Sequence, residues 1–316
     1  MRLTTVHCVP RGLHLPSWCI TLRGLKHPLR RIGARGEGRW QRISWDEALD
    51  TIADRLDQIR LELGPESVAL GYGTGRNYEA YLYRFANLFG TPNVITAGHM
   101  CFGPRIAATS ITCGRLPVCD YENNPACIMV WGSNVVWTNP DEYKGENFMR
   151  ALSARPKLIV VDPRLTFLAS RAELWLQIRP GTDTALALAM ANTIVDEKLY
   201  DRAFVEKYTH GWDSFVGRLR EYPPEKVEEI TWVPAAKIRE AARLYASTKP
   251  ACIQWGVAIE QTVNSTDNNR ILTDLMAITG NLDVPGGNVF FVPPRVRPIG
   301  EFAGHRLWMR GNEQND

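Results

Sequence analysis

Residues 158–164 read Leu158-Ile159-Val160-Val161-Asp162-Pro163-Arg164, and this stretch decides the fold class. Its four apolar, β-prone residues are too few for an ordinary helix and predict a strand that is buried on both faces. The polar triplet that follows marks the end of the strand. A helix is predicted just before it, at residues 144–152. Helix, buried strand and polar loop together form the repeating unit of an α/β protein.

The same unit recurs on both sides of this stretch. Further strands are predicted at 67–71, 127–131, 174–178 and 251–255, and further helices at 45–63, 77–89, 106–111, 184–196, 203–207, 233–247 and 265–279. Ser44, with Glu47 three residues later, predicts a capping box at the start of the first helix. Residues 224–227 are expected to lead into a turn. Strands that alternate with helices predict α/β architecture with mainly parallel sheets flanked by helices.

Length and composition fit a globular protein of two ordinary domains. The chain has 316 residues, of which 45% are hydrophobic and 22% charged. A net charge of +3 is too small to indicate nucleic acid as a partner, and no apolar run approaches the roughly 18 residues of a membrane span. Seven cysteines without paired spacing favour a reducing compartment. The sequence shows no recognisable signal peptide, so the cellular compartment is left undetermined, with the cytoplasm as the default expectation.

A single cysteine stands out in the run Ala97-Gly98-His99-Met100-Cys101-Phe102-Gly103-Pro104-Arg105. The run follows an apolar, β-prone stretch at 91–95 and precedes a predicted helix. A cysteine with Gly-Pro just behind it sits on a tight backbone, which suits a thiolate ligand for a soft metal. A lone cysteine is more often a small buried hydrophobe. The choice between the two therefore depends on the other motifs.

Polar motifs follow the predicted strands at four places: Gly132-Ser133-Asn134, Asp162-Pro163-Arg164, Gly181-Thr182-Asp183 and Trp255-Gly256 through Gln261. In an open α/β sheet, ligands lie beyond the carboxyl ends of the strands. Small residues and amides suit a phosphate or a pterin, carboxylates suit a guanine or a ribose, and arginine suits a pyrophosphate. The alternatives are plain turns, an ion pair between Asp162 and Arg164, and a helix N-cap at Thr182 or Asp183.

In their order and spacing, these motifs and residues 279–288 resemble the catalytic subunits of the molybdopterin oxidoreductases, the dimethyl-sulfoxide-reductase family. The resemblance runs from about Arg30 to about Pro294. It implies that Cys101 binds molybdenum or tungsten and that a bis-molybdopterin guanine dinucleotide is bound by Gly132, Ser133, Asn134, Asp162, Pro163, Arg164, Gly181, Thr182, Asp183, Trp255, Gly256 and Gln261. Arg105 is the candidate for orienting an anionic substrate, and His99 is a further catalytic candidate beside the metal. A structural histidine is the alternative for His99.

The resemblance is strongest to the branch of acetylene hydratase-like and thiosulfate or polysulfide reductase-like proteins. Phe102 stands where formate dehydrogenases have histidine, which disfavours formate oxidation. The implied domains are a remnant of the iron-sulfur domain at 1–38, the first half of domain II at 39–97, the α/β cofactor-binding domain III at 98–295 and an irregular tail at 296–316. Both α/β domains are thus expected to be incomplete, and the chain to be an N-terminal fragment.

Cys8 is placed like the fourth ligand of the family's [4Fe-4S] cluster, but the usual cysteine triplet is missing before it. One cysteine cannot hold a cluster that needs four, so the cluster is expected in the intact parent rather than in this chain. Residues 15–29 also depart from the family's usual sequence. A short out-of-frame segment, restored near Leu25, is our explanation for that departure.

The resemblance implies an enzyme that transfers oxygen or sulfur atoms in two-electron steps on a small-molecule substrate. Electrons would pass through the [4Fe-4S] cluster to an iron-sulfur partner subunit. The fragment itself is expected to be inactive, because a cofactor bound from one side loses preorganisation. Two alternatives remain open: a non-redox tungsten hydratase of the same family, and a degenerate fragment that acts only as a binding module.

Overall fold

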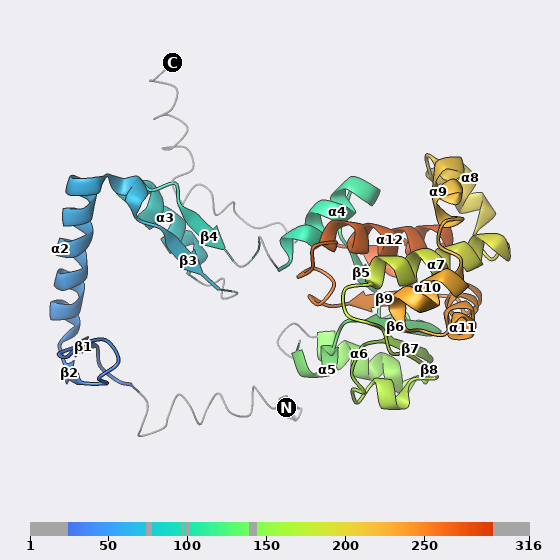
Figure 1. The fold of residues 1–316 in the computed structure, drawn as a ribbon, viewed down its shortest axis with the longest axis horizontal. Coiled ribbons are helices and arrows are strands. Elements are labelled where there is room, and N and C mark those ends of the chain that lie inside the picture. Colours follow the sequence, from blue (N-terminus) through green and yellow to red (C-terminus); the bar gives the residue numbers. More distant parts are fainter. Residues whose placement is uncertain (1–24, 74–77, 97, 99–100, 139–143, 293–316) are drawn as a thin grey trace, which may run out of the picture. The chain divides into compact units, whose positions relative to one another are not determined.

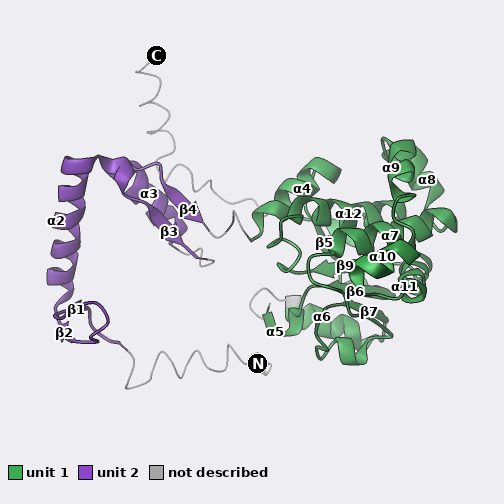
Figure 2. Cartoon of the chain, viewed as in Figure 1, with its two compact units in different colours: residues 1–10, 100–293 green, residues 11–99, 294–316 purple. Residues whose placement is uncertain are grey.

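The structure is a computed structural model that describes residues 25–73, 78–96, 98, 101–138 and 144–292. These residues form two compact units (Figure 2), one from the described residues between 100 and 293 and the other from those between 11 and 99. The predictions for Cys8, for the out-of-frame segment before Leu25, for His99 and for residues 296–316 lie outside the described residues.

A four-stranded parallel sheet is the centre of the larger unit (Figure 1). Its strands are β6 (Cys127–Trp131), β7 (Lys157–Val161), β8 (Leu174–Leu176) and β9 (Ala251–Trp255), in the order β8-β7-β6-β9. The chain moves outward from β6 through β7 to β8, and then returns to the other side of β6 as β9. The winding direction therefore reverses between β6 and β9, which makes that point the topological switch of the sheet.

Helices follow the strands, as the alternating pattern predicts. Between β6 and β7 lie α5 (Val135–Thr138) and α6 (Lys144–Ser153). The 3-10 turn η3 (Ala169–Arg171) precedes β8, and between β8 and β9 come α7 (Asp183–Asp196), α8 (Arg202–Tyr208), α9 (Trp212–Leu219), α10 (Pro224–Thr231) and α11 (Ala235–Ser247). Two more helices, α4 (Gly103–Cys113) and α12 (Ser265–Ile278), pack against each other.

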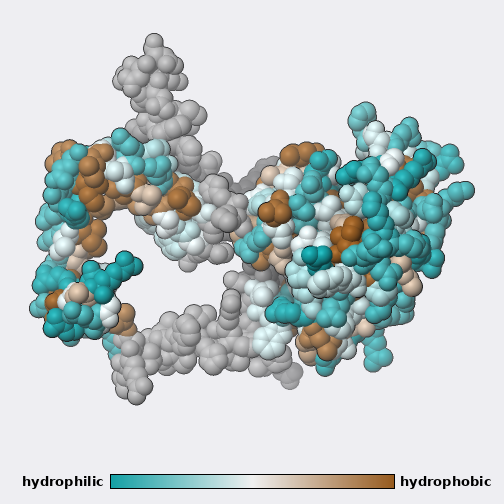
Figure 3. All heavy atoms as spheres, viewed as in Figure 1, coloured by the Kyte–Doolittle hydropathy of each residue, from teal (hydrophilic) through white to brown (hydrophobic). Residues whose placement is uncertain are grey.

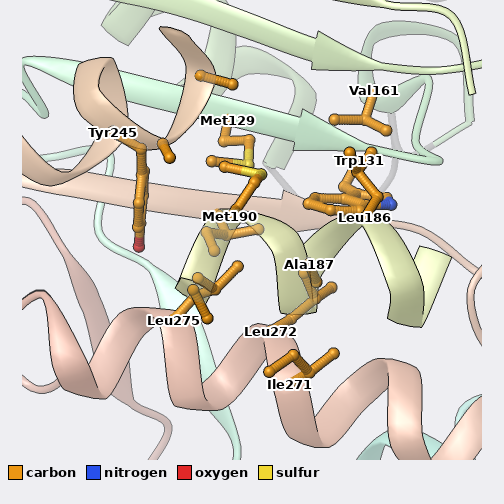
Figure 4. Close-up of a cluster of buried hydrophobic side chains, with 14 of the residues drawn as sticks. Met129, Trp131, Val161, Leu186, Ala187, Met190, Tyr245, Ile271, Leu272 and Leu275 are labelled. Carbon is orange, nitrogen blue, oxygen red and sulfur yellow. The ribbon is translucent and has the colours of Figure 1, made fainter. Parts of the chain in front are cut away.

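The strands are buried on both faces, so their side chains alternate between two apolar clusters. Ile128 and Val130 point into a cluster with Phe148 of α6. Met129 and Trp131 point into the larger cluster, which α7, α11 and α12 complete. Figure 4 shows this larger cluster, in which Leu186 and Met190 of α7 lie between the sheet residues and Leu272 and Leu275 of α12. This two-sided burial explains why the strands read as continuous apolar runs.

A small antiparallel ribbon also belongs to the larger unit. It pairs β5 (Pro117–Cys119) with β10 (Asn288–Phe290), and Asn288 lies opposite Cys119. Neither strand was predicted from the sequence, because three residues are too short to show a period. None of the helices within the described residues combines the length and the apolar character that crossing a bilayer requires.

The smaller unit contains two separate two-stranded sheets. β1 (Leu29–Arg31) and β2 (Trp40–Arg42) are antiparallel, whereas β3 (Leu70–Tyr72) and β4 (Val94–Thr96) are parallel and are accompanied by α3 (Glu79–Phe89). The long helix α2 (Trp45–Leu63) precedes a 3-10 turn, η1 (Pro65–Ser67). The turn occupies the start of the predicted strand at 67–71, so that strand begins only at Leu70.

Helix α2 confirms one half of the predicted capping box. The Ser44 hydroxyl oxygen accepts a hydrogen bond from the Glu47 backbone N–H at 3.0 Å. The Glu47 carboxylate faces the Arg30 guanidinium at 2.8 Å. The helix has no buried residue, and its Trp45, Leu49 and Ile52 side chains are 65%, 58% and 56% exposed. Apolar residues accordingly gather on the surface of α2 (Figure 3).

The prediction for residues 224–227 is wrong. These residues form the first turn of α10, with Pro224 at the first helical position, where its missing N–H costs nothing. The preceding helix, α9, was not predicted at all. The other predicted helices of the larger unit occur within a few residues of their expected bounds.

Candidate functional site

The predicted site residues follow the carboxyl ends of the four strands of the parallel sheet. Gly132–Asn134 follows β6, Asp162–Arg164 follows β7, Gly181–Asp183 comes after β8, and Gly256 follows β9 directly. Because all four strands are parallel, these ends lie along one edge of the sheet. The structure therefore brings motifs that are far apart in the sequence to a single edge, which includes the switch point.

Two glycines let the loops at the switch point approach each other. The Gly256 N–H donates to the Trp131 carbonyl at 3.1 Å. A Cβ atom on Gly256 would lie 2.3 Å from the Gly132 carbonyl oxygen. Gly132 itself has φ +54°. The close packing of the two loops is thus sufficient to explain why both positions are glycine, without a bound ligand.

Asn134 presents a buried acceptor at the same edge. Its side-chain oxygen Oδ1 is buried and has no hydrogen-bond partner among the residues that the structure describes. A buried polar atom left unpaired costs about 1–3 kcal/mol. The neighbouring Ser133 is half-buried. This part of the loop is therefore suited to a ligand that brings a hydrogen-bond donor.

Asp183 is held in place from the core of the sheet. The indole N–H of the fully buried Trp131 donates to Asp183 Oδ1 at 2.8 Å. Burial raises the pKa of Asp183, and the bond from Trp131 opposes that rise. Thr182 occupies the N-cap position of α7, but its hydroxyl donates to the Arg179 carbonyl at 2.7 Å. The predicted side-chain cap is therefore not formed by Thr182, and Gly181 has φ +84°.

The loop after β7 combines a buried carboxylate with an exposed guanidinium. Asp162 Oδ1 accepts from the Arg164 backbone N–H at 2.8 Å and lies 3.7 Å from Arg164 Nε. The Arg164 side chain is 74% exposed and the Asp162 side chain 6% exposed. The Pro163 carbonyl accepts from the Gln177 side chain at 3.2 Å. The ion pair between Asp162 and Arg164, the alternative considered from the sequence, is present at a long distance. The Arg164 guanidinium extends into solvent, where an anion can reach it.

Arg105 fastens helix α4 to the end of β9. Its Nε donates to the Glu260 carboxylate and its Nη2 to the Trp255 carbonyl at 3.0 Å. The guanidinium also lies over the rings of Trp255 at 4.5 Å and Phe102 at 5.1 Å. Burial lowers the pKa of Arg105, and the Glu260 carboxylate opposes that change. Two donor atoms of Arg105, Nε and Nη2, thus bind groups of the protein itself. The orientation of an anionic substrate by Arg105 stays a prediction.

Cys101 is a half-buried thiol directly before α4. Its charge is near enough to Arg105 to raise the pKa of that residue, as one of the smaller causes. Cys101 therefore lies near the end of β9, together with the strand-end loops. Within the described residues, no group of three or more His, Cys, Asp or Glu side chains is arranged to hold a metal ion. Cys101 is thus a candidate for a single protein ligand to a metal that the cofactor itself would hold.

Several residues that support this edge were missed in the sequence. The Trp255 indole N–H donates to Asn269 Oδ1 at 2.7 Å, and Asn268 Nδ2 donates to the Ile259 carbonyl at 2.9 Å. Both asparagines are buried, as is Glu260, whereas the predicted Gln261 is exposed. The available signal was a pair of adjacent amides on the otherwise apolar side of the helix at 265–278.

A cavity of about 610 Å³ borders this region. It is lined by Gly181 and Thr182 from the loop before α7, and by residues of α7, α9, α10 and α12. Asp274 of α12 belongs to its lining. Burial raises the pKa of Asp274 to about 6, and the nearby Arg270 opposes that rise.

The chain belongs to the molybdopterin oxidoreductase family, whose model matches residues 25–305. Acetylene hydratase of Syntrophotalea acetylenica is 39% identical over 271 residues, which cover 84% of this chain and 37% of that protein. Formate dehydrogenase H of Escherichia coli (strain K12) is 35% identical over 84% of this chain and 38% of its own length. The thiosulfate reductase subunit PhsA of Salmonella typhimurium is 33% identical over 82% of this chain and 34% of its own.

The solved structure of acetylene hydratase from Pelobacter acetylenicus is similar in fold. It matches with a TM-score of 0.79 and 35% identity, over 95% of this chain and 41% of that one. The resemblance read from the motifs and the α/β fold class are therefore confirmed. The chain spans less than half the length of these relatives.

Proposed function

We propose that this chain binds a bis-molybdopterin guanine dinucleotide carrying molybdenum or tungsten, and that it contributes to a two-electron oxidoreductase. The observation that supports the proposal is the attachment of α4 to the end of β9 through Arg105, which follows Cys101 by four positions. β9 is one of the four parallel strands that are followed by polar loops. A thiolate and a dinucleotide site at one edge of a parallel sheet are what such a cofactor needs.

The residues present fit the nucleotide part of this group. Asn134 Oδ1 is an acceptor that lacks a partner among the described residues, and Asp183 is a carboxylate fixed by Trp131. The exposed Arg164 guanidinium suits a pyrophosphate. Asp183 would bind the guanine edge, Asn134 would accept a hydrogen bond from the ligand, and Cys101 would be the protein ligand to the metal.

When bound, the group supplies a metal centre that exchanges two electrons with a small-molecule substrate by oxygen- or sulfur-atom transfer. The chain's own part is to orient and shield that centre. Arg105 fixes the α4 end, and its remaining donors face an anionic substrate. Electron transfer through a [4Fe-4S] cluster to an iron-sulfur subunit is part of the same proposal.

A non-redox hydratase is the second candidate function. Its support is the 39% identity to an acetylene hydratase and the similarity to a solved acetylene hydratase structure. In that case the same residues would hold a tungsten form of the group, and the reaction would add water without net electron transfer.

The test is to purify the chain from a host that makes the cofactor. We expect molybdenum or tungsten by mass spectrometry of the metals, and guanosine monophosphate after acid hydrolysis. Cys101→Ser should lower the metal content at least about tenfold, whereas Cys113→Ser, at a half-buried thiol on α4, should leave it unchanged. Asp183→Asn should lower the recovered nucleotide.

A folded chain that carries neither metal nor nucleotide would contradict the proposal and favour the binding-module alternative. The fragment itself is expected to be inactive, so turnover is tested on a longer family protein that contains this segment. Oxidation of a reduced dye by a sulfoxide or by thiosulfate then identifies redox chemistry. Conversion of acetylene to acetaldehyde without a dye identifies the hydratase.

A further inference from the structure

Two cysteines lie side by side where β5 meets β9. Cys119 is the last residue of β5, and Cys252 is the second residue of β9. The two strands contact each other, and the Cys119 thiol donates to the carbonyl of Ile253, the residue directly after Cys252. Cys252 belongs to the apolar cluster that contains Tyr121, on the α6 side of the sheet, and Cys119 packs against that cluster. Two thiols from distant parts of the sequence are thus brought together in one protein interior.

The backbone around this pair is fixed by bonds that do not involve Cys252. Asn288 lies opposite Cys119 in the ribbon, and its Oδ1 accepts from the Ile253 N–H at 2.8 Å. Its Nδ2 donates to the Ile253 carbonyl at 3.1 Å, and the Cys119 thiol donates to the same carbonyl at 3.1 Å. The amide of Asn288 therefore holds the end of β5 against β9, beside Cys252.

The two thiols differ in their access to solvent. Cys252 is fully buried, whereas Cys119 is half-buried and lines a cavity of about 180 Å³. That volume is several times what a water-sized molecule needs. A small molecule in this cavity therefore reaches Cys119 before Cys252. Burial raises the pKa of the Cys252 thiol, so Cys252 is suited to react second.

We propose that Cys119 and Cys252 form a dithiol site that peroxides oxidise to a disulfide. The Cys119 sulfur attacks the peroxide, an S–O bond forms, the O–O bond breaks, and the thiol proton leaves with the alcohol or water. The Cys252 sulfur then attacks Cys119. The S–S bond forms, the S–O bond breaks, and the Cys252 proton leaves in a water molecule. The two thiols lose two electrons in total and the peroxide gains them.

The resulting bond would join β5 directly to β9, just before Trp255. The carbonyl of Trp255 accepts from Arg105, so the cross-link lies next to the attachment of α4. This site does not depend on a bound cofactor, and its test is independent of the proposed function.

The experiment treats the reduced full chain with hydrogen peroxide, alkylates the remaining thiols and maps the peptides by mass spectrometry. Trypsin together with a glutamate-specific protease is needed, because cleavage at Glu122 separates Cys119 from Cys127. We expect a cross-linked pair of peptides that contains Cys119 and Cys252, lighter by two hydrogen atoms and separable by dithiothreitol. This wild-type measurement does not depend on any variant being folded.

Two variants sharpen the result. Cys252→Ala should leave Cys119 as a sulfenic acid that a dimedone probe labels, and Cys119→Ser should abolish both products. The matched control is Cys113→Ser, which removes a half-buried thiol that donates to the carbonyls of Thr109 and Arg115. It should form the disulfide as the wild type does. Alkylation of both Cys119 and Cys252 after peroxide, or a disulfide to Cys113 or Cys127 instead, would overturn the proposal.

Discussion

Asp274 of α12 should make the stability of the folded chain depend on pH, and a single substitution tests this. Burial raises its pKa from 3.8 to about 6. The folded state therefore binds this proton more tightly than the unfolded chain, and the stabilisation is complete below pH 3.8 and lost as the pH rises through 6. A shift of roughly two units corresponds to about 3 kcal/mol.

We expect Asp274→Asn to unfold at a higher urea concentration than the wild type at pH 7.5, because the variant never carries the buried charge. The two proteins should become equally stable near pH 4. Asp267→Asn, at an exposed position on the same helix and the same cavity, is the control and should show no pH-dependent difference. A stability difference for Asp274→Asn that is constant between these pH values would contradict the assignment.

Single residues also show where reasoning from the sequence stops. The strand-end residues were predictable because a polar residue after a buried strand marks an edge, and Asp162 and Asp183 do lie at such edges. Glu260 was not predictable. Its buried pairing with Arg105 joins residues 155 positions apart, and nothing local in the sequence indicates such a contact.

At the scale of elements, the junction of the loops after β6 and β9 depends on a missing side chain. Gly256→Ala would place a methyl group 2.3 Å from the Gly132 carbonyl oxygen. We expect a loss of about 2 kcal/mol or more in the free energy of unfolding, because backbone on both sides has to move. Thermal or urea unfolding measures it.

Gly217→Ala provides the comparison for that substitution. Gly217 lies within α9, where an added Cβ meets nothing within 4 Å. Alanine there should stabilise the helix by about 0.5–1 kcal/mol. If both variants change stability alike, the close approach at Gly256 is not what constrains that residue.

The N-cap of α2 stabilises the start of a helix that has no buried residue. Ser44→Ala removes the acceptor for the Glu47 N–H and should cost about 1 kcal/mol. Ser44→Asp, which keeps an acceptor, should retain most of the stability. Amide exchange in the first turn of α2 measures the effect, and equal exchange rates in the two variants would rule out the cap as its cause.

Helices and strands with a clear run or repeat of apolar residues could be predicted from the sequence, and those without one could not. β6 and β9 occur at their predicted residues, because five consecutive apolar or weakly polar residues between loops leave few alternatives. α9 and α10 are short and largely exposed, so their pattern is weak. β5 and β10 are strands only because each finds the other across the fold.

At the scale of the whole molecule, the two units differ in how they are stabilised. Helix α2 has 19 residues and none of them is buried, whereas α7 has 14 residues, eight of which are buried. Helix length alone predicts that α2 is the more stable of the two helices. Tertiary packing supplies most helical stability in proteins, and it predicts that α7 is the more stable helix.

We therefore expect the amide protons of α7 to exchange at least about tenfold more slowly than those of α2, and the strands β6, β7 and β9 to be the most protected part of the chain. Native-state hydrogen exchange followed by mass spectrometry resolves the two helices. Slower exchange in α2 than in α7 would show that burial does not set the order of local opening.

The bond between Trp131 and Asp183 has an optical consequence. The emission colour of an indole depends on the charge beside its N–H, and Trp131 is shielded from water. A molecule that approaches Asp183 or protonates it alters the light from one of ten tryptophans. The difference spectrum against Trp131→Phe isolates that contribution, so the sheet carries an intrinsic fluorophore that reports on its own carboxyl edge.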